Sequence, residues 1–318
     1  MKIAIVGPGA IGTLFAAHLK VGGFDPILID HVAERARRIS SRSLLVWSKN
    51  KSLEATVECT SDMSVAKGAE YVIIAVKAYN TAEVVKDLAS HETSSLVVSL
   101  QNGLGNLEIM GRYFESNRIL AASTGEASTL ISPGEVFHAA SGITKIAPLA
   151  PGGIGASLAL VKVLQKAGID SVFSDNAQRV LWEKLVVNSS INPLTAITRM
   201  KNGEIIRNAG LKALASQVSQ ETYEVALKKD IALGFHDPVA VVLAAASATF
   251  DNKSSMLQDI ERGRRTEVDF INGAIYRLAA SSGVPAPLNG TLYAIVKSME
   301  DRIAGSPEGL LQAVAPGN

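Results

Sequence analysis

The first thirty or so residues constrain the fold more than any other part of the chain. They predict an apolar strand at residues 3–6, a glycine turn, a helix at residues 10–21 and a second strand that ends at Asp30. A strand, a helix and a second strand in such close succession form a βαβ unit, which belongs to parallel sheets covered by helices. We therefore expect an α/β domain with a doubly wound parallel sheet at the start of the chain.

The turn between this strand and helix matches the pattern G-x-G-x-x-G. Gly7 permits the tight turn, Gly9 lets the backbone approach a pyrophosphate, and Gly12 lets the helix pack closely on the strand. The amides at the start of the helix would face the anion. The sequence therefore predicts a dinucleotide site, with FAD left open by this pattern alone, at six consecutive residues: Gly7, Pro8, Gly9, Ala10, Ile11 and Gly12.

Asp30, at the end of the second strand, carries information on which dinucleotide binds. A carboxylate at this place accepts hydrogen bonds from the ribose hydroxyls of NAD and repels the 2′-phosphate of NADP. His31, Arg35, Arg37 and Arg38 follow it and leave cationic contacts open, although a solvated helix face is the commoner use of such residues. Asp30 thus favours NAD over NADP.

Further continuous apolar runs at residues 71–76, 96–100 and 118–122 predict strands buried on both faces, as in a parallel sheet. Residues 135–147 predict an antiparallel hairpin around Ser141 and Gly142. A helix at residues 155–166 and a strand at residues 171–173 complete this domain.

Strand signals then stop, and helix-period sequence follows, broken at residues 192–193, 202–203, 234–238 and 283–287. We predict a Rossmann-type dinucleotide-binding domain at residues 1–174 and an all-helical substrate and catalytic domain at residues 175–318. The last four residues, 315–318, are expected to fray.

The composition excludes several classes of protein. With 31 Lys and Arg against 30 Asp and Glu in 318 residues, a nucleic-acid partner is not expected. The longest apolar run, residues 239–246, is far shorter than the roughly 18 to 20 residues that cross a bilayer. We expect a cytoplasmic protein without membrane contact. The same run suits a buried helix face or the interface of a homodimer, which the sequence leaves open.

Metal chemistry is not expected either. Cys59 is the only cysteine, and the five histidines show no paired spacing of the kind that zinc sites use.

Residues 182–196 carry the chemistry expected of the second half. Lys184, Asn188 and Asn192 step by four and form a polar stripe on an otherwise apolar helix. Such groups are costly to bury unless they meet partners or line a cleft, although a lysine that reaches solvent and amides that satisfy the backbone are ordinary alternatives. Reduction of a ketone needs a proton donor, which a partly desolvated lysine provides. Pro193 is expected to disrupt the helix directly after Asn192.

Taken together, the motifs resemble those of the ketopantoate (2-dehydropantoate) reductase family over essentially the whole chain. The resemblance is carried by residues 7–12, Val76-Lys77-Ala78, Gln101-Asn102-Gly103, Trp182 to Lys184, Asn192 to Thr195, Asn202-Gly203, Ser254 to Asp259 and Arg265 to Gly273.

The resemblance implies a Rossmann domain joined to a helical domain, and reduction of 2-dehydropantoate to (R)-pantoate for pantothenate synthesis, usually with NADPH. It implies that Lys184 is the general acid and that Glu267 orients it and contacts the cofactor. It assigns the cofactor also to Lys77, Asn102 and, through the backbone, Ala127. It assigns the 2-keto acid substrate to Asn102, Asn188, Asn192, Asn202, Asn252 and Ser255.

Asp30 departs from the family pattern, because members that use NADPH commonly carry an arginine near this place. The cofactor is therefore NADP(H) by family resemblance or NAD(H) by the chemistry of Asp30. The alternative function is an NADH-dependent D-2-hydroxyacid dehydrogenase that acts on another branched 2-keto acid. A dinucleotide sensor without catalysis is a third hypothesis, and Lys184 and Glu267 speak against it because sensing needs no proton donor.

Overall fold

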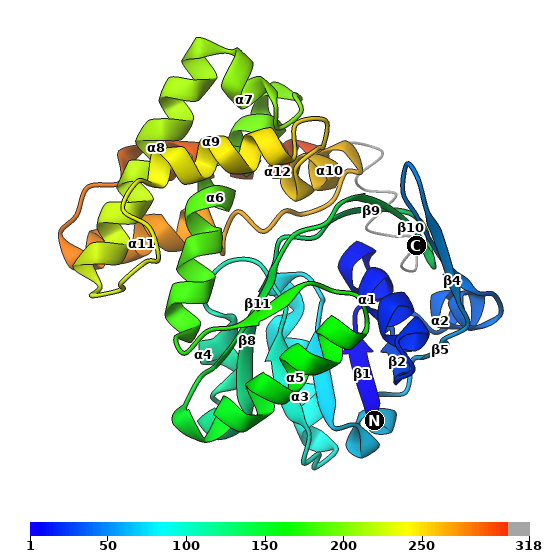
Figure 1. Cartoon of the computed structure of the whole chain (residues 1–318). Helices are drawn as coiled ribbons and strands as arrows, with labels where there is room; N and C mark the ends of the chain where they lie inside the picture. The colour runs from blue at the N-terminus through cyan, green and yellow to red at the C-terminus, as the bar shows by residue number, and fades with distance from the viewer. Residues whose placement is uncertain (305–318) are drawn as a thin grey trace. The chain divides into compact units, whose positions relative to one another are not determined.

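The computed structural model describes residues 1–304, so the tail at residues 315–318 lies outside the described residues. The chain divides into two compact units (Figure 1). The nucleotide unit consists of Met1–Gln101 and Gly105–Val180, and the helical unit consists of Asn102–Leu104 and the chain from Leu181 onward. The domain boundary predicted between residues 174 and 175 stays a prediction.

The nucleotide unit is built on an eight-stranded sheet in the order β12-β11-β8-β7-β6-β1-β2-β5. From β5 to β8 all neighbouring pairs are parallel, β11 runs antiparallel to β8, and β12 is parallel to β11. The strands are apolar because both faces are buried, as at Ile3, Ala4 and Ile5. Their bounds are β1 Lys2–Val6, β2 Asp25–Ile29, β5 Glu58–Thr60, β6 Tyr71–Ile74, β7 Leu96–Ser99, β8 Ile119–Thr124, β11 Thr144–Pro148 and β12 Ser171–Phe173.

A second sheet of four strands, in the order β4-β3-β10-β9, packs against helix α1 from the side opposite the main sheet. Figure 1 shows β9 and β10 crossing over α1. Its strands are β3 Leu44–Trp47, β4 Ser52–Ala55, β9 Ala127–Ser132 and β10 Glu135–Ala140. The helices of this unit are α1 Ala10–Val21, α2 Ala33–Ser40, α3 Thr81–Ser90, α4 Asn106–Met110 and α5 Ile154–Lys166, with short 3-10 helices at Met63–Gly68, Ala78–Asn80, Ser116–Arg118 and Pro151–Gly153.

The hairpin predicted at residues 135–147 is wrong, although both of its strands exist. β10 pairs with β9 across a turn at Pro133 and Gly134, while β11 pairs with β8 in the main sheet. Gly134 has a φ of +82°, which favours glycine and makes this turn the true reversal. Gly142, which the sequence placed in the hairpin turn, instead approaches Gly125, where an added Cβ would lie 2.5 Å from the Gly125 oxygen.

The helical unit surrounds α6 with shorter helices. Its apolar core includes Val186, Ile191 and Leu194 of α6, together with Val218 of α8 and Val242 of α9. The helices are α6 Ala177–Thr198, of which the first four residues belong to the nucleotide unit, then α7 Glu204–Arg207, α8 Ala209–Lys228, α9 Pro238–Ala248, α10 Ser255–Glu261, α11 Asn272–Ser282 and α12 Pro287–Ala304.

Pro193 does not break α6, contrary to the prediction from sequence. The helix continues through it to Thr198, so the disruption expected after Asn192 is absent. Proline removes the N–H that would bind the carbonyl of Ser189, four residues earlier. The side-chain amide of Asn272 donates to this carbonyl at 3.0 Å instead, which compensates the loss. A tertiary contact of this kind cannot be read from the local sequence.

The predicted fold class, a Rossmann-type doubly wound sheet with a helical second part, is confirmed by this topology. Within residues 1–304, none of the helices combines the length and the apolar character needed to cross a bilayer. In the apolar run at residues 239–246, Val242 and Ala246 are buried in the core of the helical unit. A homodimer stays a prediction.

Candidate active site

The glycine turn has the backbone geometry that its sequence predicts. Gly7 has a φ of +104°, and a Cβ there would lie 2.8 Å from the backbone nitrogen of Val76. A Cβ at Gly12 would lie 2.1 Å from the Gly7 oxygen, so the helix could not start at this distance with any other residue. A Cβ at Gly9 meets nothing within 4 Å. The turn therefore leaves room at the N-terminus of α1, where backbone amides can hold an anionic pyrophosphate.

This turn lies at the place where the strand order reverses. β1 pairs with β2 on one side and with β6 on the other, and the chain returns from β5 across β1 to reach β6. Ligands of open α/β sheets bind at such a switch point, beyond the carboxyl ends of the strands. Lys77 follows β6 at this edge and is partly buried, in agreement with its predicted location.

Gln101 was not given a role by the sequence, yet it fixes this edge of the sheet. Its amide nitrogen donates to the Val76 carbonyl at 3.0 Å and to the Thr81 hydroxyl at 2.7 Å. Val76 is the residue nearest to a Cβ added at Gly7. Gln101 thereby fixes the backbone of Val76 beside the glycine turn.

Asp30 is 1 % exposed, just past the end of β2, and its carboxylate is held by Arg35. Nη2 of Arg35 lies 2.6 Å from Oδ1, Nε donates to Oδ2, and the backbone N–H of Val32 donates to Oδ1 at 3.0 Å. Arg35, which the sequence placed on a solvated helix face, is therefore a partner of Asp30. Arg35 lies five residues after Asp30, at the start of α2, and this spacing is the sequence signal that could have indicated the pair.

In the helical unit, the predicted stripe lies on α6. Asn188 and Asn192 are buried, and Lys184 is partly buried between apolar neighbours such as Leu181 and Leu185. Burial lowers the pKa of the Lys184 ammonium from its ordinary value of 10.5. Within residues 1–304, the amine makes no hydrogen bond or ion pair. A desolvated ammonium gives up its proton more readily than one in water, as a general acid must.

A chain of hydrogen bonds joins three of the predicted site residues in the same unit. Nδ2 of Asn188 donates to Oδ1 of Asn102 at 3.1 Å, and Nδ2 of Asn102 donates to Oε2 of Glu267 at 3.3 Å. The three residues come from α6 and from two loops about 165 positions apart in sequence. The sequence therefore assembles one polar group from three separate segments.

Gly103 brings the first of these loops against the second. With a φ of +82°, it passes so close to Phe270 that an added Cβ would lie 2.5 Å from the Phe270 oxygen. The N–H of Leu104 donates to the same oxygen at 2.9 Å. The turn at Asn102 and Gly103 thus places Asn102 next to Glu267.

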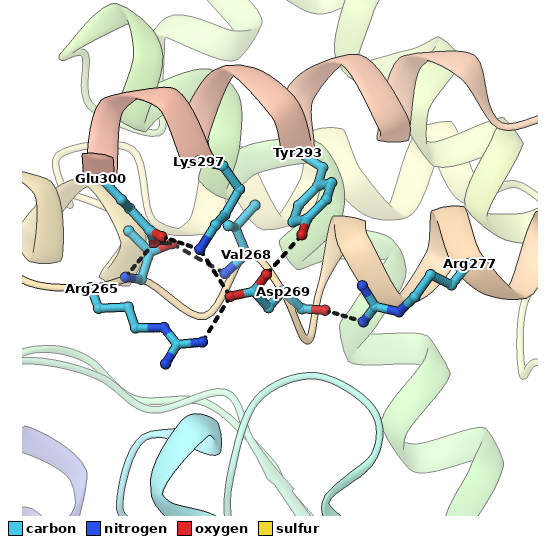
Figure 2. A network of polar contacts seen from close by, with 8 residues as sticks. Arg265, Val268, Asp269, Arg277, Tyr293, Lys297 and Glu300 are labelled. Carbon is cyan, nitrogen blue, oxygen red and sulfur yellow. Dashed lines mark hydrogen bonds and ion pairs between the residues drawn. The ribbon is translucent and has the colours of Figure 1, made fainter. Parts of the chain in front are cut away.

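The loop that carries Glu267 is anchored on both sides of that residue (Figure 2). Before it, the N–H and hydroxyl of Thr266 donate to Glu300 at 2.7 and 2.6 Å. After it, Asp269 accepts from Tyr293 at 2.9 Å, from Arg265 at 3.0 Å and from Lys297 at 3.2 Å. Burial acts against the charged form of Asp269, but these hydrogen bonds hold its pKa below the ordinary value of 3.8.

The remaining predicted substrate residues gather around the second half of α6. The N–H of Asn202 donates to the Asn252 carbonyl at 2.9 Å, and Thr195, one turn after Asn192, bonds the hydroxyl of Ser254 at 2.7 Å. Within residues 1–304, Oδ1 of Asn202 and Nδ2 of Asn252 are buried without a hydrogen-bond partner. Ser255 follows Ser254 as the first residue of α10. Buried amide groups that lack partners within the chain are suited to bind a polar ligand.

Ala127 starts β9 in the nucleotide unit, directly after the buried Glu126. Nε2 of His138 lies 2.6 Å from Oε2 of Glu126. This hydrogen bond, against a smaller effect of burial, raises the pKa of His138 above its ordinary value of 6.5. The pair fixes the strand at the position of Ala127.

The structure therefore brings Asn102, Asn188 and Glu267 into one hydrogen-bonded chain, and it brings Asn202 and Asn252 together. It gives Lys184 no hydrogen bond to Glu267 within residues 1–304, so an orienting role for Glu267 stays a prediction. In the same residues, no group of His, Cys, Asp and Glu has the arrangement of a metal site. Sequence reasoning missed four supporting residues. Arg35 bonds the site residue Asp30, whereas Gln101, Asp269 and Asn272 fix residues close to site residues in the chain.

Comparison with known proteins identifies the family of this chain. The family model described as "Ketopantoate reductase PanE/ApbA" matches residues 3–151, and the model described as "Ketopantoate reductase PanE/ApbA C terminal" matches residues 176–300. Among curated proteins, the chain is 36 % identical to a 2-dehydropantoate 2-reductase from Archaeoglobus fulgidus, covering 94 % of this chain and 98 % of that protein. It is 35 % identical to the same enzyme from Pyrococcus horikoshii, covering 96 % and 100 %.

Two solved structures resemble this chain over nearly its whole length. D-mandelate dehydrogenase with NADH and anilino(oxo)acetate superposes with a TM-score of 0.90 at 28 % identity, covering 96 % of this chain and all of the other. A PanE/ApbA family ketopantoate reductase from Ralstonia eutropha gives a TM-score of 0.85 at 31 % identity, covering 95 % and 99 %. The chain belongs to the ketopantoate reductase family and is an oxidoreductase.

Proposed function

We propose that this member of the ketopantoate reductase family reduces 2-dehydropantoate to (R)-pantoate. The observation that carries the proposal is the stripe of Lys184, Asn188 and Asn192 on α6, with an ammonium whose pKa is lowered by burial. The bound nicotinamide coenzyme supplies the hydride. A ketone that receives a hydride also needs a proton on its oxygen, and Lys184 donates it.

In this proposal, Lys184 and the hydrogen-bonded chain of Asn188, Asn102 and Glu267 have separate roles. Lys184 also stabilises the negative charge that develops on the ketone oxygen before the proton arrives. Asn188 is oriented by Asn102, whose own orientation is fixed because Glu267 only accepts hydrogen bonds when ionised. Glu267 thereby sets the direction of the whole chain of amides.

The second group of amides binds the rest of the substrate. The carboxylate and hydroxyl groups of the 2-keto acid are held by four residues: Asn192, Asn202, Asn252 and Ser255. The buried Asn202 oxygen and Asn252 nitrogen supply an acceptor and a donor that have no other partner in the described part of the chain. Neutral groups of this kind specify orientation without placing a second buried charge next to Lys184.

The coenzyme binds to residues of the nucleotide unit that fit a dinucleotide. The space above Gly9 and the amides at the start of α1 receive the pyrophosphate, and Lys77 and the backbone at Ala127 contact the coenzyme further along. Asn102 and Glu267 contact its nicotinamide end. The same residues suit NAD and NADP, because the two coenzymes differ only in the 2′-phosphate of the adenosine ribose.

NADH is the proposed coenzyme. Asp30 carries a buried negative charge at the end of β2, where it repels a 2′-phosphate and accepts hydrogen bonds from ribose hydroxyls. Arg35 offsets part of this charge and occupies part of the carboxylate, so the preference depends on both residues. A preference of the parent protein for NADPH would contradict this assignment of Asp30.

A second candidate is a D-2-hydroxyacid dehydrogenase that acts on another 2-keto acid. The observation in its favour is the likeness to D-mandelate dehydrogenase in complex with NADH. The two reactions share the same acid and hydride chemistry and differ in the substrate side chain that the helical unit accepts.

One assay separates these functions. Purified protein is tested with 2-dehydropantoate and with a panel of branched and aromatic 2-keto acids, each with NADH and with NADPH. We expect the highest kcat/KM with 2-dehydropantoate. A higher value for another acid would assign the second candidate, and the absence of turnover on every acid would favour a sensor.

A further inference from the structure

Helix α6 contains an open position in its hydrogen-bond ladder between two of its functional amides. Pro193 lacks an N–H, so the carbonyl of Ser189 lacks the donor that a helix regularly supplies four residues later. Ser189 is fully buried, so bulk water does not reach this carbonyl. Asn188 comes directly before Ser189, and Asn192 directly before Pro193. The geometry of this turn therefore sets how Asn192 lies relative to Asn188 and Lys184.

Asn272 provides the missing donor from another helix. It is fully buried as the first residue of α11, and its Nδ2 lies 3.0 Å from the Ser189 oxygen. The second hydrogen of the same amide goes to Oδ1 of Asn289 at 3.0 Å. Oδ1 of Asn272 has no partner in the described part of the chain, so this side chain is used only as a donor.

Two acceptors fix the direction of this chain of amides. At one end is the Ser189 carbonyl, and at the other is the carboxylate of Glu221, which accepts from Nδ2 of Asn289 at 3.0 Å. A carbonyl and a carboxylate only accept, so neither Asn272 nor Asn289 can turn its amide over without losing its bonds.

Glu221 ties the chain of amides to the rest of the unit. Its carboxylate also accepts from the backbone N–H groups of Leu288 and Asn289 in the first turn of α12, at 2.9 and 3.0 Å. Glu221 itself belongs to α8. The turn of α6 between Ser189 and Pro193 is therefore held by groups from α8, α11 and α12.

We propose that Asn272 is a positioning residue, whose side-chain amide replaces the N–H missing at Pro193 and so holds Lys184, Asn188 and Asn192 in the arrangement that reaction requires. Asn289 and Glu221 keep that amide in place. This inference rests on the proposed function of the three side chains on α6. It assigns a role in turnover to a residue that touches neither substrate nor coenzyme.

The test is a double-mutant cycle between Asn272→Ala and Pro193→Ala, read as kcat for keto acid reduction and as affinity for the coenzyme. In the parent, Asn272→Ala should lower kcat about tenfold, because displacement of a catalytic group is costly, and leave coenzyme Kd within about twofold. In the Pro193→Ala background the same change should lower kcat less than about twofold, because the alanine that replaces the proline supplies its own N–H to the Ser189 carbonyl.

Ser190→Ala is the matched control. Ser190 is equally buried on α6, but its hydroxyl donates at 2.8 Å to the Val186 carbonyl of the same helix, its only partner among the described residues. Its loss should change kcat less than about twofold in both backgrounds. A control that behaves like Asn272→Ala would show that any buried polar loss in α6 has this effect, and would contradict the proposal.

Equal effects of Asn272→Ala in the two backgrounds would also overturn it. If Asn272→Ala does not fold alone, recovery of folded, active protein in the double variant supports the proposal, and failure of the double variant contradicts it. Turnover of Lys184→Ala tests the proposed function separately. If Lys184→Ala keeps the kcat of the parent while the effects of Asn272→Ala and Pro193→Ala are still coupled, the assignment of Lys184 as general acid is wrong and the role of Asn272 stands.

Discussion

The nucleotide turn and the helical site hold their functional groups in different ways. The turn at Gly7, Gly9 and Gly12 is a property of the backbone, because an added Cβ at Gly12 or Gly7 would lie only 2.1 or 2.8 Å from other backbone atoms. The helical site is made of side chains from α6 and from the loops at Asn102 and Glu267. One depends on six adjacent residues, and the other depends on contacts between distant segments.

This difference teaches where each site is vulnerable. A backbone site is lost when space is filled, whereas a side-chain site is lost when a donor or acceptor is removed. The helical unit also has support around its functional groups, since Asp269, Glu300 and Asn272 hold the residues next to them. We therefore expect the two regions to separate experimentally into binding effects and turnover effects.

Lys184→Ala should give the largest effect. Loss of the general acid is expected to lower kcat at least about a hundredfold, with coenzyme Kd nearly unchanged because the glycine turn is intact. Steady-state kinetics and coenzyme titration measure the two quantities. Lys212→Ala, at an exposed lysine of α8, is the control and should leave both unchanged. Turnover within a few-fold of the parent would remove Lys184 from the mechanism.

Gly12→Ala should give the converse result. Its methyl group would meet the Gly7 oxygen, so the turn must move, and we expect coenzyme affinity to fall about tenfold or more, with stability lowered by about 1–3 kcal/mol. Gly155→Ala is matched to it, because Gly155 also lies in a helix of the nucleotide unit but meets nothing within 4 Å. An unchanged coenzyme affinity in Gly12→Ala would contradict the binding role of the turn.

Asp30→Ala should change coenzyme choice without abolishing turnover. Removal of the carboxylate ends its repulsion of a 2′-phosphate and releases Arg35, so kcat/KM should fall with NADH and rise with NADPH, by about tenfold in their ratio. Arg35→Ala is the companion variant. It should lower kcat/KM with NADPH relative to the parent, because the charge of Asp30 is then no longer offset by Arg35. A ratio that does not change in Asp30→Ala would show that preference is set elsewhere.

The smallest expected effect concerns stability as a function of pH. The stabilisation by His138 in the nucleotide unit and the stabilisation by Asp269 in the helical unit should change with pH in opposite directions. Because the pKa of His138 is raised above 6.5 by Glu126, its stabilisation is present below about pH 6.5 and is lost as pH rises through the raised value. Because the pKa of Asp269 is lowered below 3.8, its stabilisation is present above about pH 3.8 and is lost as pH falls through the lowered value.

Thermal unfolding of two variants tests this contrast. The Tm difference between the parent and His138→Gln should shrink by the order of 2 °C between about pH 6 and pH 9. The difference between the parent and Asp269→Asn should stay constant over this range and shrink only in acid. The same pH dependence in both variants would refute the assignment of these shifts to the two pairs.

The sequence predicted the nucleotide unit well where the information is local. The βαβ start, the glycine turn and the later strands follow from apolar runs and glycines that are close together in the chain. The hairpin at residues 135–147 was wrong because strand partners are chosen across the sheet, and Gly134 makes the turn that Gly142 was expected to make.

In the helical unit the sequence predicted the residues of the stripe but not what holds them. Periodicity showed that Lys184, Asn188 and Asn192 share one face of a helix. It could not show that Asn272 compensates Pro193, because that hydrogen bond joins residues 83 positions apart. The pairing of Asp30 with Arg35 was missed because a basic residue on a helix is usually solvated.

The pH profile of kcat at saturating coenzyme and 2-keto acid tests the central claim most directly. The account predicts that reduction slows as pH rises through the lowered pKa of Lys184, at a pH below 10.5, because only the ammonium can donate the proton. Lys184→Arg, which stays protonated throughout, should be slow and should lose this decline. A kcat that stays constant up to pH 10.5 in the parent, or the same decline in Lys184→Arg, would contradict the account.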